Sequence, residues 1–563
     1  MTTDRTTPSN LPGAFGRLTG GIAVRVGGVL TSFQAAVERH SLGLQTIAYT
    51  VAFTMGLALR FIQMDRLGIN SDEAVYAGQA ATLAEVPGFA EDFSIFRAHP
   101  LLYQYTLSLV FRVFGFSEVA GRNLSAVFGV ATLYVAYLIG KRLAGRAAGL
   151  VAAAILAVMP FHIIVARQAL LESPMTLFYA ASIYALIRYF DALDSDASTR
   201  LARWGWAFAI GSFAGLSFMS KEVAVIVVPM VFVAVMVTSH FRWGHVLIMS
   251  GAFAVTVLPH LLALKLGPAS EGGGGWAEYV IWQVARPANH PIKFYASNLF
   301  VYFGLPMLVL LLIGIWMSIR RISERPDLVV ILISIVVPFW FFQVWKVKGF
   351  HYPVITAPLA AALVAWVLIG WWRSESRTQR GIATLAATAT LISLIWISAI
   401  NGPIADNSHR VGDAGYSGIP GGREAALWLA ENAPEGSRML GIGPSIGNII
   451  RWYSDHATSA LSISPNPLRA NPAYIPVRNP DFELRWGLVE YLVYDAYSAA
   501  RTPHFANRLL DFVERYGGEI VHEEWAPLIG DDGREYLAPV IRIYRVGPVG
   551  IDLAALDTDG AAE

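Results

Sequence analysis

Two adjacent carboxylates are the first residues in the sequence whose type and place suggest chemistry. Asp72 and Glu73 lie in the stretch INSDEAVYAGQA (69–80), a few residues beyond an apolar run that extends from Leu44 to Met64. A carboxylate at a membrane boundary can take a proton from an acceptor hydroxyl, while nearby Arg, Lys or His side chains neutralise a departing phosphate. The alternative is structural, because Asp is a favoured N-cap residue and Asp72 could cap a helix that starts at Glu73.

The composition places the chain in a membrane. Of its 563 residues, 55% are hydrophobic and only 15% are charged, whereas an ordinary soluble domain carries about 25% charged residues. A net charge of +1 argues against a nucleic-acid partner. The chain has no cysteine, which excludes disulfides and metal sites built from thiolates. The sequence therefore predicts an integral membrane protein.

Basic residues decide how the apolar segments cross the membrane. A span needs roughly 20 apolar residues. The segment 101–116 is shorter and contains Arg112, so we expect it to be a partial or membrane-surface helix. The positive-inside rule then puts the N-terminus and the arginine-rich loops, such as KRLAGR (141–146), in the cytoplasm. The eleven predicted spans are 44–64, 119–140, 148–166, 173–190, 205–220, 222–239, 246–264, 296–317, 328–345, 353–372 and 381–400.

This topology divides the chain into parts on the two sides of the cell membrane. Residues 1–43 form a cytoplasmic segment, residues 44–400 form the transmembrane domain, and the first loop (65–100) and residues 401–563 lie outside. In the last part, REAALWLAENAPEG is typical of a helix, and VEYLVYD and VIRIYRV have strand composition. Helices that alternate with strands favour a small α/β domain. We therefore predict a polytopic α-helical membrane protein with an extracytoplasmic α/β domain that serves acceptor recognition or gating.

Ionisable side chains are costly at membrane depth, so each one at the outer boundary is a candidate for function. Each also has a structural alternative. Lys221 with Glu222, and Arg167 with Glu172, could form ion pairs between helices, and Arg122 could snorkel to the membrane surface. The candidates at the outer side are Asp72, Glu73, His99, Arg122, Arg167, Glu172, Lys221, Glu222, His260, Lys346, Lys348 and His351.

A series of motifs in this order resembles the GT-C glycosyltransferases, most closely their branch of protein O-mannosyltransferases and aminoarabinose transferases. The motifs are SDEAVYAGQA, HPLLYQYTLSLVFRVFG, GRNLSAVFG, the segment KRLAGRAAGLVAAAILAVMPFHIIVARQALLES, and GLSFMSKE. Together they cover roughly residues 45–222, and KVKGFHYPVITAPLAA (346–361) is a weaker similarity. Their order and spacing, more than any one of them, carry the resemblance.

The resemblance implies a fold in which juxtamembrane helices of the first external loop carry the catalytic acid. By position that acid is Asp72, with Glu73 beside it. Arg122 matches an arginine that the mannosyltransferases need for activity, and the loop from Lys348 to Tyr352 is one that approaches the lipid phosphate in relatives. The implied substrate-binding residues are His99, Arg122, Arg167, Glu172, Lys221, Lys348, His351 and Tyr352.

The function implied is transfer of a sugar from a polyprenyl-phosphate lipid in the bilayer to a protein, lipid or glycan acceptor that arrives from outside. Asp72 would act as general base in a single displacement that inverts the anomeric centre, and the cations would stabilise the leaving phosphate. We expect no metal or other cofactor, although Asp72 and Glu172 could supply a pair of carboxylates for a divalent ion. The competing functions are a transporter or flippase for lipid-linked sugars and a scaffold without catalytic activity. No inverted repeat is visible in the sequence.

Overall fold

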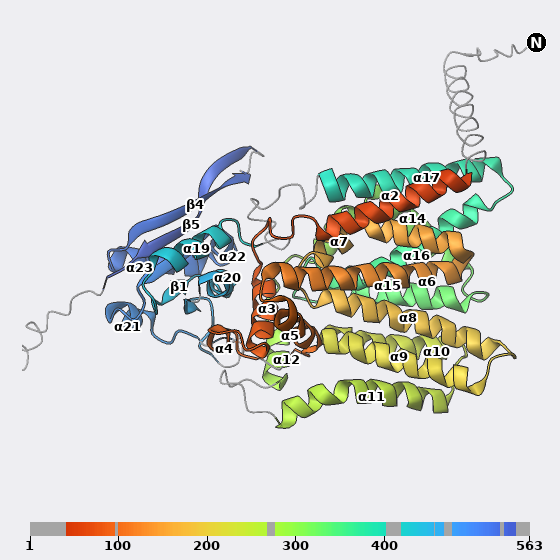
Figure 1. Cartoon of the computed structure of the whole chain (residues 1–563), viewed down its shortest axis with the longest axis horizontal. Helices are drawn as coiled ribbons and strands as arrows, with labels where there is room; N and C mark the ends of the chain where they lie inside the picture. The colour runs from red at the N-terminus through yellow and green to blue at the C-terminus, as the bar shows by residue number, and fades with distance from the viewer. Residues whose placement is uncertain are drawn as a thin grey trace, which may run out of the picture.

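The computed structural model has two parts, a bundle of helices and an α/β domain docked on one end of it (Figure 1). The predictions for residues 1–40 and 401–417 concern segments outside the described residues. The structure describes residues 41–95, 99–266, 276–400, 418–454, 456–466, 474, 476–529 and 534–547.

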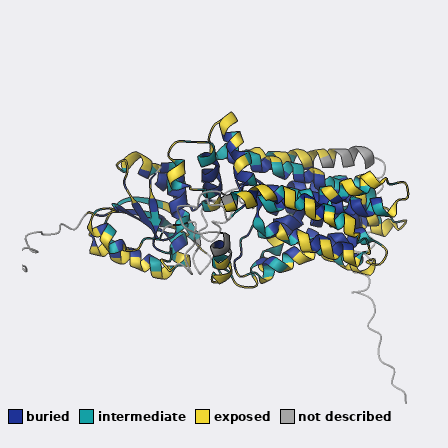
Figure 2. Cartoon of the chain, turned by 90° about the horizontal axis from the view of Figure 1, so that it is seen from below, coloured by how far each residue is buried: buried dark blue, intermediate teal, exposed yellow. Residues whose placement is uncertain are grey.

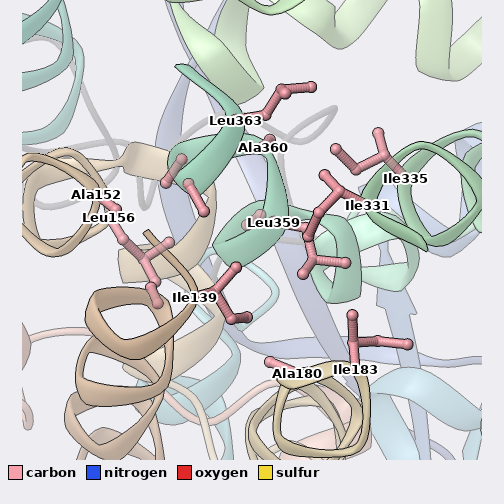
Figure 3. Packing of buried hydrophobic residues seen from close by; sticks show 14 of the residues in the cluster. Ile139, Ala152, Leu156, Ala180, Ile183, Ile331, Ile335, Leu359, Ala360 and Leu363 are labelled. Carbon is pink, nitrogen blue, oxygen red and sulfur yellow. The ribbon is translucent and has the colours of Figure 1, made fainter. Parts of the chain in front are cut away.

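The bundle consists of apolar helices that run side by side, with α16 at its centre (Figure 1). Residues 357–369 of α16 are all buried. Leu359, Ala360 and Leu363 pack among aliphatic side chains of α6, α8 and α15 (Figure 3). The helices are α2 (Ser41–Phe61), α6 (Glu118–Val158), α7 (Pro160–Ala166), α8 (Glu172–Asp194), α9 (Arg200–Ser220), η1 (Glu222–Ile226), α10 (Val227–Val237), α11 (Trp243–Leu266), α13 (Phe294–Phe303), α14 (Leu305–Arg320), α15 (Pro326–Val344), η2 (Tyr352–Thr356), α16 (Ala357–Trp372), α17 (Arg377–Ile395) and η3 (Trp396–Ile400).

Four short helices lie between the bundle and the α/β domain (Figure 1): α3 (Ser71–Leu83), α4 (Phe89–Asp92), α5 (Leu102–Phe114) and α12 (Trp276–Ala285). With 13 residues, α5 is too short to cross a bilayer, as the sequence predicts for this segment. The first loop (65–100) therefore contributes α3 and α4 to this layer of short helices on the end of the bundle.

One predicted span is bent, and one long helix holds two predicted spans. The segment expected at 296–317 bends by 108° between α13 and α14, where Gly304 has φ +65° and Pro306 occupies the first turn of α14. The 41 residues of α6 include a reversal at Ala144 and Gly145, the latter with φ +82°. The two limbs of α6 lie against each other, because a Cβ on Gly149 would be 2.6 Å from the carbonyl oxygen of Tyr137.

Five helices of the described residues are long and apolar enough to cross a membrane, or six if the bent pair is one span. The helices α2, α8, α9 and α10 do not meet that test, and α6 holds two predicted spans. The count of eleven spans therefore stays a prediction. Apolar side chains exposed on the outside of the bundle, such as Leu247, Val255 and Leu312, give it a surface suited to lipid (Figure 2).

The loops predicted to be cytoplasmic gather at the end of the bundle far from the α/β domain (Figure 1). Arg142 forms ion pairs there with Asp191 and, at 3.5 Å, with Asp327. Arg325 donates to the carbonyl oxygen of Leu143 at 3.2 Å. Three loops that connect successive helices therefore meet at one end of the bundle. This agrees with the topology predicted from the arginines, in which these loops share one side of the membrane.

The α/β domain has a five-stranded sheet with strand order β2-β1-β3-β5-β4. The first three strands are parallel, and β5 is antiparallel to both β3 and β4. One apolar cluster includes Ile449 and Val493, and a second includes Leu440 and Phe512. The elements are α19 (Gly422–Asn432), β1 (Met439–Gly441), α20 (Pro444–Ser454), β2 (Thr458–Ala460), α21 (Pro480–Arg485), β3 (Tyr491–Asp495), α22 (Ala496–Arg501), α23 (Pro503–Arg515), β4 (Glu519–Ile529) and β5 (Glu535–Arg545).

The α/β domain contacts the first loop and approaches a second loop, the one that contains His290. Arg451 of α20 donates to the carbonyl oxygen of Asp92 at 3.3 Å, and Trp452 packs against Phe89, with 5.6 Å between ring centroids. Near the second loop, burial lowers the pKa of His290, and the positive charge of Arg501 lowers it further.

The two ends of the bundle should face opposite sides of the membrane. Because the chain has no cysteine, Ala197→Cys and Glu435→Cys, each at an exposed residue, introduce single labelling sites at the two ends. We expect an impermeant maleimide added to intact cells to label the cysteine at 435 but not the one at 197. Labelling of both from outside would contradict the topology.

Candidate functional site

The first turn of α3 presents the two carboxylates and fixes one of them. Asn70 caps the helix: its side-chain oxygen accepts from the backbone N–H groups of Asp72 and Glu73, both at 2.9 Å. Glu73 accepts in return from the N–H of Asn70 at 3.0 Å. Asp72 is therefore not the cap, and the helix starts at Ser71. The spacing of Asn70 and Glu73 is a capping-box pattern that the sequence already contained.

Asp72 is left available for chemistry. Its side chain is exposed, and its carboxylate makes no hydrogen bond or ion pair with the part of the chain that the structure describes. The carboxylate lies close enough to two tyrosines to affect them. Burial raises the pKa of Tyr76 well above its usual value, and the negative charge of Asp72 adds to the rise. The same two causes raise the pKa of Tyr474, which comes from the α/β domain.

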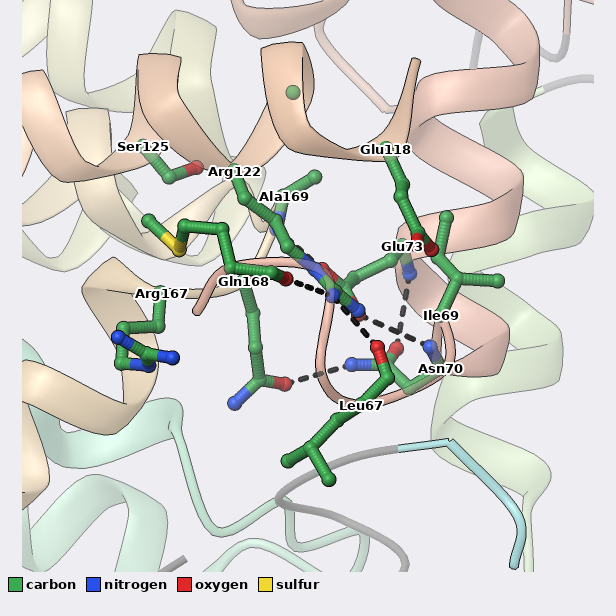
Figure 4. A network of polar contacts seen from close by, with 12 residues as sticks. Leu67, Ile69, Asn70, Glu73, Glu118, Arg122, Ser125, Arg167, Gln168 and Ala169 are labelled. Carbon is green, nitrogen blue, oxygen red and sulfur yellow. Dashed lines mark hydrogen bonds and ion pairs between the residues drawn. The ribbon is translucent and has the colours of Figure 1, made fainter. Parts of the chain in front are cut away.

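Glu73 forms a fully buried pair with Arg122 (Figure 4). The Nε and Nη2 atoms of Arg122 donate to the two carboxylate oxygens at 2.9 and 3.0 Å. The backbone N–H of Ala169 donates to the same carboxylate at 2.8 Å. With Asn70, this gives Glu73 four hydrogen bonds that join α3, α6 and the turn before α8. Glu73 is engaged in structure, in contrast to the exposed carboxylate beside it.

Arg122 uses its remaining donors on the loop that leads to α3. Its Nη1 donates to the carbonyl oxygens of Met64 and Leu67 at 2.6 and 2.7 Å, and its Nη2 donates to that of Gly68 at 3.0 Å. A guanidinium has five N–H donors, and all five are engaged. This geometry disagrees with the expectation that Arg122 binds the lipid phosphate, because no donor is left for one, and with snorkelling, because the side chain is buried.

Arg167 also satisfies backbone rather than a carboxylate. Its Nη1 donates to the carbonyl oxygens of Leu59 and Ile62 at 2.6 and 2.9 Å, and its Nη2 to that of Gln63 at 3.0 Å. These groups end helix α2, where carbonyls lack partners within the helix. The suggested ion pair between Arg167 and Glu172 is not formed.

Arg60 is a buried residue that sequence analysis missed. It lies in α2 and donates through Nη1 to the carbonyl oxygens of Gly56 and Ala157 at 2.7 and 2.6 Å. Its Nη2 lies 2.8 Å from Nδ1 of His162. Its position in the apolar run 44–64 could have indicated this role, because an arginine inside such a run needs buried partners.

Glu172, Lys221 and His351 form a buried polar cluster near the start of α8. The Nζ of Lys221 contacts one carboxylate oxygen of Glu172, and the Nε2 of His351 lies 3.3 Å from the same oxygen. Lys221 also lies over the ring of Tyr352, with Nζ 4.9 Å from its centroid. Burial lowers the pKa of His351, although the charges of Glu172 and Asp72 oppose that effect. The influence of Asp72 shows that the cluster is near the exposed carboxylate.

His99 connects the first loop to a second polar cluster. Its Nδ1 lies 2.9 Å from Glu222, and its Nε2 lies 2.9 Å from the hydroxyl of Tyr279 on α12. Glu222 is therefore paired with His99, and not with Lys221 as the alternative interpretation had it. Tyr76 of α3 contacts the His99 ring edge-on, with 6.2 Å between centroids. His99, Glu222 and Tyr279 thus lie beside the helix that carries Asp72.

Arg286, which sequence analysis did not single out, is a cation at this place with N–H donors that no described residue accepts. It follows α12, is partly exposed, and lies over Trp282, with Cζ 4.4 Å from the ring centroid. Its one hydrogen bond to a described residue is to Gln283, at 3.3 Å. The positive charge of Arg286 lowers the pKa of Tyr474, which the negative charge of Asp72 raises. Arg286 and Asp72 therefore both lie near Tyr474.

Lys348 lies in the loop between α15 and η2 and is buried. Its Nζ donates to the carbonyl oxygen of Trp345. Its backbone is held by Asn289, which donates to the Lys348 carbonyl at 2.8 Å and accepts from the Lys348 N–H at 2.8 Å. The loop expected to approach the lipid phosphate is therefore fixed to the segment that follows Arg286. His260 is also buried, against Phe218.

No group of three or more His, Asp or Glu side chains among the described residues is arranged to hold a metal ion. The hydrogen bonds and ion pairs described above bring several of the predicted residues together at one site. Asp72, His99, Glu172, Lys221, His351 and Tyr352 gather there, while Glu73, Arg122 and Arg167 support the loop behind it.

Comparison with known proteins shows which fold positions these residues. The structure is similar to ArnT from Cupriavidus metallidurans in the apo state, with a TM-score of 0.60 and 14% identity over 90% of this chain and 98% of that one. The chain has the fold of the GT-C glycosyltransferases. Residues 98–262 match the family described as dolichyl-phosphate-mannose-protein mannosyltransferase. No curated protein sequence matches the chain.

Two further structures share the GT-C fold with this chain. ArnT bound to undecaprenyl phosphate aligns with 91% of this chain and 98% of its own, at 15% identity and a TM-score of 0.60. The archaeal oligosaccharyltransferase AglB from Archaeoglobus fulgidus, in complex with an inhibitory peptide and a dolichol-phosphate, aligns with 89% of this chain and 74% of its own, at 14% identity and a TM-score of 0.60. The predicted resemblance is confirmed.

The buried pair of Arg122 and Glu73 should matter for stability more than for donor binding. A lysine at 122 has three donors in place of five, so buried oxygens lose their partners, each at about 1–3 kcal/mol. We expect Arg122→Lys to lower the thermal unfolding midpoint in detergent. The matched control is Arg112→Lys, because Arg112 forms an exposed pair with Glu85, and it should leave the midpoint unchanged.

A different result would restore Arg122 to the substrate site. If Arg122→Lys left the unfolding midpoint unchanged but weakened binding of a polyprenyl-phosphate lipid, the arginine would be a phosphate ligand.

Proposed function

We propose that this protein transfers a sugar from a polyprenyl-phosphate lipid to an acceptor at the end of the bundle that the α/β domain covers. The observation that carries the proposal is the exposed carboxylate of Asp72, which pairs with none of the described residues and lies beside a buried cluster of Glu172, Lys221 and His351. The GT-C fold supports it, since the solved relatives include ArnT bound to undecaprenyl phosphate and AglB bound to a dolichol-phosphate.

Asp72 is the general base of the proposed reaction. Its carboxylate takes the proton from an acceptor hydroxyl, or from an amide if the acceptor is asparagine, as the acceptor atom attacks the anomeric carbon. The bond from that carbon to the phosphate oxygen breaks, and its electron pair leaves with the polyprenyl phosphate. A single displacement inverts the anomeric configuration. A carboxylate free of structural partners is suited to this role, because its lone pairs are available to the incoming proton.

Arg286 is the proposed principal ligand of the leaving phosphate, with Lys348, His351 and Tyr352 beside it. A guanidinium can hold a phosphate through two N–H groups at once. Arg286 has donors that no described residue takes, whereas all the donors of Arg122 are engaged. The hydrogen bonds between Asn289 and Lys348 tie the two proposed phosphate-binding loops together. Arg122 and Arg167 take the role of positioning residues for the loop before α3.

The α/β domain supplies the acceptor side of the proposed site. Asn448 of α20 donates to the hydroxyl of Ser71 at 3.0 Å and to that of Tyr474 at 2.9 Å. Burial raises the pKa of Tyr474, and the negative charge of Asp72 raises it further. The acceptor classes that remain open are protein, lipid and glycan. AglB was solved with a peptide, which favours trying peptides first.

A lipid flippase is the competing function. A flippase needs polar groups along a path through the membrane, whereas Asp72, Glu172 and Glu222 lie in the first turns of α3, α8 and η1. Helix α3 lies at the end of the bundle that the α/β domain covers (Figure 1). We place that end on the outer face of the cell membrane and propose that the reaction needs no metal.

Replacing the proposed base should nearly abolish transfer. Because general-base action contributes typically 10²–10⁴-fold, we expect Asp72→Asn to lower turnover by about that factor while the unfolding midpoint stays within a degree or two. The measurement is release of polyprenyl phosphate from a radiolabelled polyprenyl-phosphate sugar by the purified protein, with and without EDTA. The matched control is Glu91→Gln, an exposed carboxylate in the same loop.

Three outcomes would count against this account. Full activity in Asp72→Asn would remove Asp72 as the base. Absence of release by the wild-type protein, together with movement of the intact lipid across a vesicle membrane, would establish the flippase. Loss of activity in EDTA, restored by Mg²⁺ or Mn²⁺, would show that a metal is required after all.

The phosphate ligand can be tested separately. Arg286→Lys keeps the charge but loses bidentate contact, so we expect the KM for the donor lipid to rise several-fold with the protein still folded. Arg320→Lys is the control, since Arg320 stacks on Trp316 in the same way at the opposite end of the bundle. An unchanged KM in Arg286→Lys would exclude Arg286 from the donor site.

A further inference from the structure

The loop from Asp65 to Asn70 is held from two sides, by the bundle and by the α/β domain. Arg122 reaches it from the bundle, as described above. From the other side, Arg423 of α19 donates through Nη1 to the carbonyl oxygen of Asp65 at 2.7 Å and through Nη2 to that of Leu67 at 3.2 Å. This loop leads directly into the helix turn that carries Asp72.

Glu118 and Tyr453 complete the contact. Arg423 forms an ion pair with Glu118, the first residue of α6. The hydroxyl of Tyr453 on α20 donates to the second oxygen of Glu118 at 2.6 Å and accepts from the N–H of Ile69 at 2.9 Å. It also accepts from Nε of Arg423 at 3.2 Å. Arg423, Tyr453 and Glu118 form one network, here called the interdomain clamp.

Single backbone groups of the loop are shared between the two parts of the protein. The carbonyl oxygen of Leu67 accepts from both Arg122 and Arg423. The carbonyl oxygen of Gly68 accepts from Arg122 and, at 3.2 Å, from the N–H of Gly418. Contact is close enough that a Cβ on Gly418 would lie 2.6 Å from the carbonyl oxygen of Ile69. The loop cannot move without breaking hydrogen bonds to both parts.

We propose that Arg423 and Tyr453 are positioning residues for Asp72, so that the α/β domain completes the catalytic centre as well as covering it. The inference rests on the proposed function of Asp72. Tyr453 holds the N–H of Ile69, Asn70 caps the helix, and Asp72 follows two residues later. Proton transfer requires the base within about 2.6–3.2 Å of the acceptor oxygen, and a displacement of about 1 Å can cost 10²-fold in rate.

The clamp predicts a specific kinetic pattern. We expect Tyr453→Phe and Arg423→Lys each to lower kcat by about 10- to 100-fold while the KM for the donor lipid changes less than twofold, because the proposed phosphate ligands are untouched. Since both side chains act through one network, the double variant should be little slower than the slower single one. Arg542→Lys is the matched control, because Arg542 pairs with Glu523 within the sheet.

Amide hydrogen exchange tests the clamp without any assay of activity. In the full-length protein, we expect the amides of residues 65–73 to exchange faster in Tyr453→Phe and Arg423→Lys than in the wild type, while those of β3 and α8 stay unchanged. Tyr453→Phe loses only a hydroxyl, so it remains informative if Arg423→Lys folds poorly. Unchanged exchange in 65–73, or faster exchange with wild-type kcat, would overturn the inference.

Failure of the proposed function has a different signature. If Asp72→Asn kept full turnover while the clamp variants still exchanged faster, the clamp would exist but would not serve a base at Asp72. If Asp72→Asn were inactive and the clamp variants were normal in both kcat and exchange, the base assignment would stand and the positioning role would fall.

Discussion

The buried pair between Arg122 and Glu73 is the interaction on which the rest of the site depends. Two charges removed from water are tolerated only when they pair closely and every remaining donor and acceptor is satisfied. Here the carboxylate takes four hydrogen bonds and the guanidinium gives five. Satisfying them requires α3, α6 and the loop after α2 to meet in one arrangement. The pair thus acts as a geometric constraint on the loop before Asp72.

The same need for partners explains why arginines collect where α2 ends. The last carbonyls of a helix have no partner within it, and an unsatisfied buried carbonyl is costly. Arg60, Arg167 and Arg122 donate in turn to seven carbonyls between residue 56 and residue 68. Arg423 continues the series from the α/β domain. The arginines in this region donate mainly to backbone carbonyls, so the proposed chemistry falls to other side chains.

Sequence patterns predicted the elements well and their partners poorly. Apolar runs marked the helices, Arg112 marked α5 as short, and alternation of helix and strand marked the α/β domain. The bend at Gly304 could not be foreseen, because an apolar run has the same composition whether it is straight or broken. The sequence could not show that Arg122 donates to backbone carbonyls, because a charge at a membrane edge is equally expected to meet a ligand or a carbonyl. Arg286 was missed because its significance comes only from neighbours distant in sequence.

The two adjacent carboxylates have different roles in the fold. Glu73 is buried and bonded within the structure, whereas Asp72 is exposed and can act as the reactive group. The most direct test is a cryo-electron microscopy structure of the protein with bound polyprenyl phosphate. The account predicts the phosphate between Arg286 and Tyr352, on the side of α3 that Asp72 faces, with Arg122 still paired to Glu73. A phosphate held by Arg122 with that pair broken, or one bound at the opposite end of the bundle, would contradict it.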